Sequence, residues 1–340
     1  GLSKHEAPEP LYTAEQGEKA TKLFRPVEFR QQFQVGDIKL ELHPVGHILG
    51  AAAVILSSNG KRVGFSGDVG RSNDLLMKPP APLPPVDVLL LESTYGDRRH
   101  QETDVREELA EVINEAAKNG GPVLIPSFAV GRAQLMQHLI VSLMDEGKIP
   151  KIPVFLDSPM AIKVSHIYRT HHQYHRLTAE QCERAENVVE YTHSVDESKA
   201  IAGQNGPHII IAGSGMATGG RILHHFKHWL ADHRATVLFS GYQAGGTRGD
   251  KMMQGVENIK VHGDWIPVRA NIRNLDGLSG HADYQELTQW LHDSKLPAGT
   301  EIHLVHGEPN ALECFRDHLL ATTKFSVDVP DYMSILTIND

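Results

Sequence analysis

Residues 122–132 read PVLIPSFAVGR, an apolar run that ends in a serine and leads directly into a segment with helical periodicity. The same arrangement recurs at residues 153–161 (PVFLDSPMA), 208–221 (HIIIAGSGMATGGR) and 236–246 (TVLFSGYQAGG). Short apolar runs bounded by turn residues predict strands that are covered on both faces. Because helical segments separate these strands, the pattern predicts a parallel, doubly wound sheet of the α/β class.

The residues before this block have a period of two. Residues 35–43 alternate between polar and apolar side chains, which predicts a single strand with one exposed face. Residues 51–57 and 62–66 predict a hairpin that turns at Ser58-Asn59-Gly60, and the apolar run at residues 86–92 predicts a buried strand.

Helical spacing returns in three further places. Apolar side chains at positions 105, 109, 112, 113 and 116 fall on one face of a helix. Past residue 279, the sequence predicts a helix at 284–294, a strand at 301–305 and a helix at 309–322. The chain is therefore β-rich first, then α/β, with a short α/β segment at its end.

Composition restricts the class of protein. The chain has 340 residues, about two domains, and carries 33 Lys and Arg against 42 Asp and Glu, a net charge of −9. This charge disfavours binding to nucleic acid by bulk attraction but leaves a local basic groove open. Only Cys182 and Cys314 are present, and there is no secretory or membrane-spanning pattern. We therefore expect a cytoplasmic protein that does not associate with membranes. The unusual count is 21 His.

Small hydroxyl residues end the four central strands. At the carboxyl edge of a parallel sheet, such hydroxyls and the free N–H groups of helix N-termini suit phosphate oxygens. A serine before a helix is, however, most often a simple N-cap. The Gly-rich stretch at 213–220 lacks the third glycine of a dinucleotide-binding fingerprint, which disfavours a nicotinamide cofactor. The phosphate-binding candidates are Ser127, Ser158, Ser214 and Ser240, with Arg132 and Arg221 as counter-charges.

Five other residues are typical of metal chemistry. His47, Asp68, Glu92, His281 and His306 each lie at or near the end of a predicted strand or the start of a helix, and four have a glycine beside or close to them. Imidazole and carboxylate groups suit Zn²⁺, which lowers the pKa of a bound water to about 7. The alternative for each is ordinary: an aspartate that forms a turn, or an exposed loop histidine. Together they predict a hydrolytic metal site.

These motifs together resemble the metallo-β-lactamase superfamily and, within it, the β-CASP nucleases, a family that includes bacterial and archaeal ribonucleases and the nuclease subunit of the pre-mRNA 3′-cleavage factor. GHILGAA (46–52) and FSGDVGR (65–71) resemble the third and fourth metal motifs. LLLESTYGDR (89–98), LSGHADY (278–284) and LVHGEPNAL (304–312) resemble the three motifs peculiar to β-CASP proteins.

The resemblance implies a partial metallo-β-lactamase αββα sandwich at residues 1–96 and 280–340, with an inserted doubly wound β-CASP domain at residues 97–279. It implies a zinc-dependent ribonuclease that hydrolyses RNA phosphodiester bonds in RNA processing or decay. Members that act on RNA carry His at the position of His306, whereas members that act on DNA carry Val. Relatives commonly dimerise, so the resemblance allows a homodimer.

The resemblance also implies residue roles. His47, Asp68 and His306 would be metal ligands, with Asp68 bridging two zinc ions. Asp68 would also take part in catalysis with His281, which would stabilise the phosphate or donate a proton to the leaving group while Glu92 orients it. The inserted domain would bind RNA through Ser127, Arg132, Ser158, Ser214 and Arg221.

The chain departs from the family in one respect. The His-x-His-x-Asp-His signature is absent from its sequence. The resemblance therefore predicts that on the order of a hundred residues of the lactamase-like domain are missing from the front. Each zinc would keep two protein ligands, so we expect weak or empty metal sites. The alternatives are a non-catalytic RNA-binding or scaffold protein, a DNA nuclease of the same superfamily, and a small-molecule hydrolase.

Overall fold

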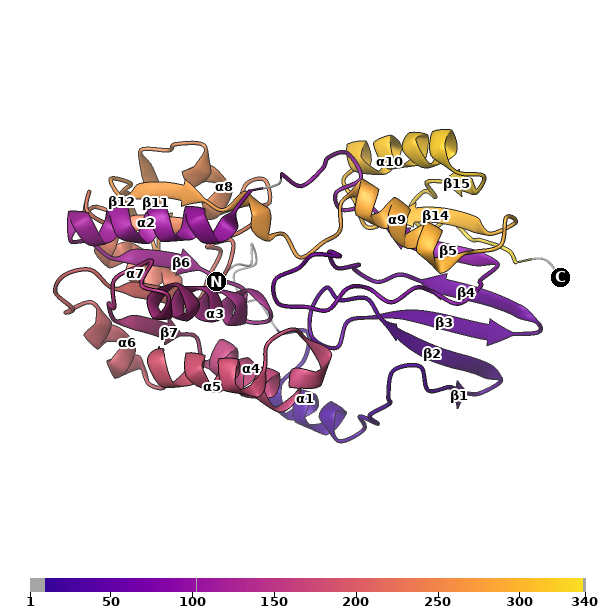
Figure 1. Ribbon diagram of the computed structural model, residues 1–340, viewed down its shortest axis with the longest axis horizontal. Helices are drawn as coiled ribbons and strands as arrows, with labels where there is room; N and C mark the ends of the chain where they lie inside the picture. Colours follow the sequence, from indigo (N-terminus) through magenta and orange to yellow (C-terminus); the bar gives the residue numbers. More distant parts are fainter. Residues whose placement is uncertain (1–9, 102, 339–340) are drawn as a thin grey trace.

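Two β-sheets with different strand directions organise the protein (Figure 1). The computed structural model describes residues 10–101 and 103–338. The first sheet has the order β1-β2-β3-β4-β5-β14-β15, antiparallel from β1 to β4 and parallel from β4 onward. Its strands are β1 (Phe33–Val35), β2 (Ile38–Pro44), β3 (Ala52–Ser58), β4 (Lys61–Phe65), β5 (Val88–Glu92), β14 (Glu301–Val305) and β15 (Ser326–Asp328).

One face of the first sheet is covered by α9 (Tyr284–Ser294) and α10 (Pro309–Thr322). Ile55 and Leu89 of the sheet are fully or almost fully buried in the same core as Phe315 of α10. The opposite face carries the alternate residues, such as Phe65 of β4, which is 38% exposed. This sheet therefore has one packed face and one partly exposed apolar face.

Two sequence predictions for this sheet have different outcomes. The predicted hairpin at β3 and β4 is confirmed, because Asn59 and Gly60 both adopt the positive φ that its tight turn requires. The single strand predicted at residues 35–43 is wrong. The chain turns at Gly36, which has a φ of +57°, and forms the separate strands β1 and β2. The sequence did carry a signal for this turn, because the apolar positions change from odd-numbered (Phe33, Val35) to even-numbered (Ile38, Leu40, Leu42) across Gly36-Asp37.

The second sheet is parallel throughout and has the order β13-β10-β6-β9-β7-β8. Alternate residues of its strands enter two separate cores, one with helices α2 to α5 and the other with α7. The predicted doubly wound sheet is confirmed. Its strands are β6 (Val123–Pro126), β7 (Val154–Asp157), β8 (Glu190–Tyr191), β9 (Ile209–Ala212), β10 (Thr236–Phe239) and β13 (Asn271–Asn274), and a separate hairpin is formed by β11 (Asn258–Val261) and β12 (Asp264–Pro267).

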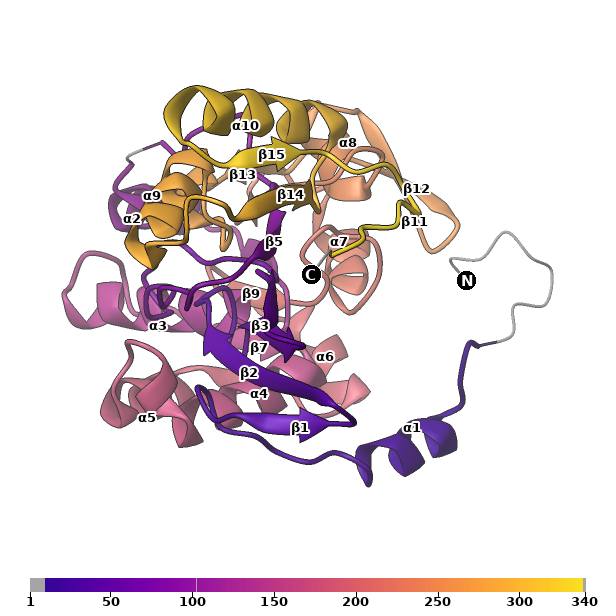
Figure 2. The same cartoon turned by 90° about the vertical axis from the view of Figure 1, so that its right-hand side faces the viewer.

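Helices connect these strands, as the periodicity predicts. All five apolar positions predicted for α2 are buried. The α-helices are α2 (Val105–Asn119), α3 (Arg132–Asp145), α4 (Pro159–Thr170), α5 (Ala179–Val188), α6 (Val195–Ile201), α7 (Ile222–Trp229) and α8 (Arg248–Met253), with 3₁₀ turns η1 (His172–Tyr174) and η2 (Asp276–Leu278). An N-terminal helix, α1 (Ala14–Thr21), has no buried residue and projects from the body (Figure 2).

The chain leaves the first sheet after β5 and returns to it at β14, and these two strands are adjacent and parallel. Just beyond β5, Tyr95 forms a β-bridge with Asp283, at the start of α9. The predicted domain boundaries at 96/97 and 279/280 fall beside this bridge and stay a prediction; the first nine residues of the proposed lactamase-like part, and its last two, lie outside the described residues. Within residues 10–101 and 103–338, no helix is both long and apolar enough to cross a membrane.

Candidate active site

The five predicted metal and catalytic residues come from five places in the first sheet and its loops. His47 follows β2, Asp68 follows β4 and Glu92 ends β5. His306 follows β14, and His281 lies three residues before α9. The structure brings all five to one end of the sheet, where ion-pair distances link them.

Backbone contacts hold three of these loops together. Gly46 forms an antiparallel bridge with Val69, and Gly70 forms one with His281. In addition, the N–H of Gly70 donates to the carbonyl of Val45 at 2.7 Å. The loops that carry His47, Asp68 and His281 are therefore held together by a short backbone ladder at the end of the sheet where these residues lie.

Gly70 is the residue that permits this close approach. A Cβ atom at position 70 would lie 2.1 Å from the carbonyl oxygen of Gly46 and 2.7 Å from the backbone nitrogen of His47. Both atoms are backbone, so they cannot move aside as the end of a side chain could. Any side chain at this position would separate the loops.

Asp68 lies between two histidines, and each of its oxygens faces one of them. The Oδ2 atom is 3.8 Å from Nε2 of His47, and the Oδ1 atom is 3.4 Å from Nδ1 of His306. Nδ1 of His47 donates to the carbonyl of Gly280 at 3.1 Å, which leaves Nε2 with its lone pair toward Asp68. Each oxygen of Asp68 is therefore close to one imidazole.

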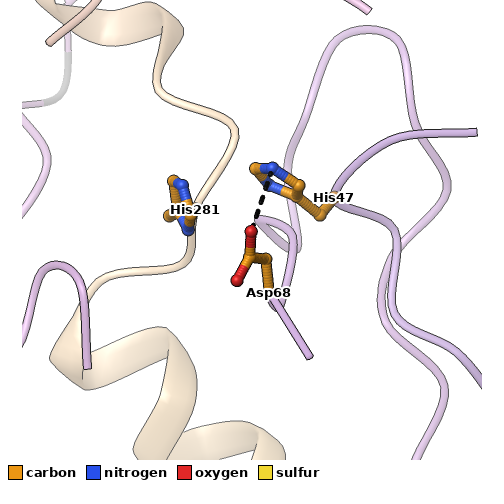
Figure 3. A group of neighbouring side chains, drawn as sticks. All are labelled: His47, Asp68 and His281. Carbon is orange, nitrogen blue, oxygen red and sulfur yellow. Dashed lines mark ion pairs between the residues drawn. The ribbon is translucent and has the colours of Figure 1, made fainter. Parts of the chain in front are cut away.

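Three of the five residues lie close enough together to hold a divalent metal such as zinc, but this group contains His281 in place of the predicted ligand His306. Ligand atoms of His47, Asp68 and His281 all lie within 4.8 Å of one another (Figure 3). Two imidazoles and a carboxylate are the ligand types that Zn²⁺ prefers. The ring centroids of His47 and His281 are 4.3 Å apart.

Glu92 anchors His281 from the interior. Its carboxylate is 1% exposed and accepts hydrogen bonds from the N–H of Val69 at 2.5 Å and the hydroxyl of Thr94 at 2.6 Å. Nδ1 of His281 donates to the same carboxylate at 3.3 Å. The Nε2 atom of His281 is therefore the one left to face a substrate.

These contacts shift three pKa values. Burial alone would raise the pKa of Glu92, but its hydrogen bonds to His281, Thr94 and Val69 together lower it. Burial opposes the charged form of His281 as well, yet the Glu92 carboxylate raises the pKa of that imidazole. Burial and the neighbouring His281 lower the pKa of His47, which favours the neutral form that binds metals.

Beside these residues is a cavity of about 450 Å³ that extends from the first sheet to the second. His47, Thr94, Tyr95 and His281 line it on one side, and loops of the second sheet, including Ser240 and Arg132, line it on the other. The predicted catalytic residue His281 and the predicted RNA-binding residue Arg132 thus face the same space.

The other three predicted serines make local hydrogen bonds. Ser158 is the N-cap of α4, with its hydroxyl accepting from the N–H of Ala161 at 3.3 Å. The hydroxyl of Ser127 donates to the carbonyl of Phe128, and that of Ser214 bonds to Thr218. They end adjacent strands, as predicted, and their contact with RNA stays a prediction.

Arg132 is half-buried in the cavity wall at the start of α3, with its Nη1 atom covered. Its Nη2 donates to the carbonyl of Leu278, and among the described residues its Nη1 has no hydrogen-bond partner. Burial lowers the pKa of this guanidinium to about 10. A buried cationic N–H group without a partner is suited to a phosphate oxygen.

Arg221, in contrast, has an internal partner. Its Nη1 donates to the fully buried carboxylate of Asp157 at 2.5 Å, and Nε2 of His225 is 2.7 Å from the other oxygen of the same group. Burial would raise the pKa of Asp157, but the bonds to His225, Ser198 and Arg221 lower it. The structure therefore gives Arg221 a structural role, and its contact with RNA stays a prediction.

Sequence reasoning missed the residues that support His281 from behind. Nε2 of His100 donates to the carbonyl of His281 at 2.8 Å. Asp283 and Glu286 form the capping box of α9, and Arg71 is paired with Glu286. The signal for Asp283 was present, because Asp followed by Glu three residues later marks a helix start. His100 carried none, because its partner is 181 residues away.

Comparison with known proteins agrees with this geometry. Residues 133–252 match the Beta-Casp domain, and residues 265–330 match the Zn-dependent metallo-hydrolase RNA specificity domain. A ribonuclease from Thermus thermophilus is 37% identical over 315 residues, which cover 89% of this chain and 70% of that protein. The chain belongs to the β-CASP family of metallo-β-lactamase-type nucleases.

Two proteins from Methanocaldococcus jannaschii also match. An RNase J-like protein is 29% identical over 333 residues, covering 96% of this chain and 77% of that protein. The transcription termination factor FttA is 30% identical over 350 residues, covering 97% of this chain and 54% of that protein. The chain thus spans about half the length of FttA.

Gly70→Ala tests the backbone ladder. The added Cβ would displace the Gly46–His47 loop, so we expect a loss of about 1–3 kcal/mol in the free energy of unfolding, measured with urea. Gly299→Ala is the matched control, because a Cβ there meets nothing within 4 Å. Equal stabilities of the two variants would contradict the close approach.

Arg221→Ala tests the buried ion pair with Asp157. Removal of one partner leaves a buried carboxylate with less compensation, so we expect a loss of about 3 kcal/mol in the free energy of unfolding. Arg234→Ala removes a surface ion pair with Asp232 and should change the free energy of unfolding much less. If Arg221→Ala has the same free energy of unfolding as the wild type, the ion pair with Asp157 does not stabilise the fold. The guanidinium would then be available for another partner.

Proposed function

We infer that the protein is a metal-dependent ribonuclease that hydrolyses RNA phosphodiester bonds. The observation that carries this inference is His306 beside Asp68, at 3.4 Å, because the resemblance associates His at this position with RNA. The match of residues 265–330 to an RNA specificity domain and the ribonuclease name of a relative support it. RNA processing or decay is the process that these similarities favour.

We propose that His47, Asp68 and His306 hold zinc, with Asp68 shared between two ions. Zinc would supply Lewis-acid polarisation of the phosphate and a water that is acidic enough to react near neutral pH. The two oxygens of Asp68 each face one imidazole, which supports the assignment of His47 to one ion and His306 to the other. Each site then has two ligands from this chain, fewer than the three or four that bind zinc firmly.

We propose that His281 acts on the phosphate and the leaving oxygen. Glu92 accepts from its Nδ1 atom and raises the pKa of the ring, which favours the charged form, and Nε2 would be the atom that donates a proton to the leaving oxygen. The same charged ring would stabilise negative charge on the phosphate. His100 and Glu92 hold the His281 loop and ring in position.

We propose that the cavity between the sheets takes the RNA strand next to the reacting phosphate. Arg132 would bind a neighbouring phosphate through Nη1, and Ser127, Ser158, Ser214 and Arg221, which lie outside the lining of this cavity, are further candidates for contact with the strand. A cytoplasmic location is a proposal supported by the two free cysteines, and a homodimer is one supported by the partly exposed apolar face around Phe65.

The metal proposal makes a quantitative prediction. In equilibrium dialysis against zinc, the wild-type chain should bind the metal weakly and lose it on extended dialysis, because each site has two ligands from this chain. Asp68→Ala should abolish binding at both sites, whereas His47→Ala should affect one. His292→Ala, at an exposed position, should bind like the wild type. Two tightly held zinc ions per chain would contradict the two-ligand sites.

The ribonuclease proposal assigns catalysis to His281 and RNA binding to Arg132, so variants of these two residues should have different effects. With zinc present, His281→Gln should lower the single-turnover rate on a single-stranded RNA oligonucleotide by about 100-fold or more and change its dissociation constant little. Arg132→Ala should mainly weaken RNA binding. A DNA oligonucleotide of the same sequence should be cut more slowly. A chain that binds RNA without cutting it would favour the scaffold alternative, and faster cleavage of DNA would favour the DNA nuclease.

A further inference from the structure

The cavity wall opposite the histidines is formed partly by exposed apolar side chains. Phe128, directly after β6, is 49% exposed although it lines the cavity. Met160 is 65% exposed and Tyr242 49% exposed, and both line the same cavity. Apolar side chains gathered in an open site mark a surface that binds something.

The Phe128 ring is fixed in place by a glycine. A Cβ at Gly215 would lie 2.7 Å from both Cδ2 and Cε2 of the ring and 3.0 Å from Cγ. Similar distances to three successive ring atoms mean that the backbone of Gly215 faces the flat side of the ring rather than its edge. The ring therefore lies flat on the chain at residue 215, and its other side is available to the cavity.

This contact explains a motif that the catalytic residues leave unused. The Gly-rich stretch at 213–220 lacks the spacing of a dinucleotide site, and its residue Gly215 instead provides the surface on which Phe128 rests. A flat aromatic ring with one supported face and one accessible face is the geometry of a stacking platform. Every nucleobase has a π-face that can stack on such a ring.

We propose that Phe128 is a stacking platform for one nucleobase of single-stranded RNA, flanked by Met160 and Tyr242. This proposal rests on the ribonuclease function proposed above. The buried guanidinium of Arg132 lines the same cavity, so the wall offers an apolar surface for a base and a cation for a phosphate. A single strand presents both groups with its bases unpaired, whereas a duplex hides the faces of its bases.

The test uses an RNA oligonucleotide in which 2-aminopurine replaces one base at a time, with no metal added so that the strand stays intact. Stacking quenches the fluorescence of this base. The wild-type chain should quench it strongly at one position or two adjacent ones. Phe128→Ala should remove that quenching and raise the dissociation constant about tenfold.

Three other variants make the result specific. Phe128→Tyr keeps the ring and should keep the quenching. Gly215→Ala keeps Phe128, but its added Cβ displaces the ring from the backbone of residue 215, so it should reduce the quenching. This variant tests the platform even if Phe128→Ala does not fold. Trp265→Ala removes an exposed aromatic residue of β12 and should change nothing. Circular dichroism confirms that each variant is folded.

The possible failures are distinguishable. If the wild-type chain does not bind the RNA at all, the proposed function fails and the platform with it. If it binds and quenches, but folded Phe128→Ala and Gly215→Ala quench equally well, the platform is overturned while the ribonuclease proposal stands.

Discussion

The carboxylate of Glu92 lies at the end of β5 with almost no exposure, where an unpaired charge would strongly destabilise the fold. It is tolerated because three groups bond to it: the backbone N–H of Val69, the hydroxyl of Thr94 and the ring of His281. Two of these belong to other segments, one of them 189 residues away. Satisfying this one charge therefore draws the Asp68 loop and the His281 loop to the same strand end, and the geometry of the site follows from it.

The site has groups for reaction and groups for recognition on opposite walls. His47 and His281 belong to the first sheet and its loops, and in the proposed function they hold metal or move a proton. Arg132, Phe128 and Tyr242 belong to loops of the second sheet, and they offer a cation and flat apolar surfaces. If the proposed function is right, each sheet contributes a different part of one binding site, and the distance between the sheets sets how the ligand is held.

The sequence predicted the structure best where one local pattern decides it. The apolar face of α2 and the Asn59-Gly60 turn are of this kind, since neighbouring residues alone determine them. The turn at Gly36 was missed because the period of two is the same on both sides of it, and only the phase of the apolar positions changes there.

For the site, residue types and strand ends predicted five residues that the structure places at one end of the first sheet, and their roles stay a prediction; the residues that surround them were not predicted. Nothing local shows that Arg221 pairs with Asp157, 64 residues earlier, or that His100 bonds to the His281 loop. The close packing at Gly70 and the seat of Phe128 on Gly215 likewise depend on contacts between separate segments. Such contacts leave no periodic signal in the chain.

The bridge between Tyr95 and Asp283, reinforced by the N–H of Tyr284 donating to the carbonyl of Tyr95 at 3.1 Å, joins the two ends of the second sheet's segment. For the first sheet, the segment between Tyr95 and Asp283 acts as one long loop whose two ends are held together. The pairing of β5 with β14 already brings the two ends of this segment together, and the entropy lost on closing a loop increases only slowly with its length. The length and composition of the segment therefore have little effect on the stability of the first sheet. The architecture is modular: a different recognition unit could occupy this same stem while the reacting groups keep their positions.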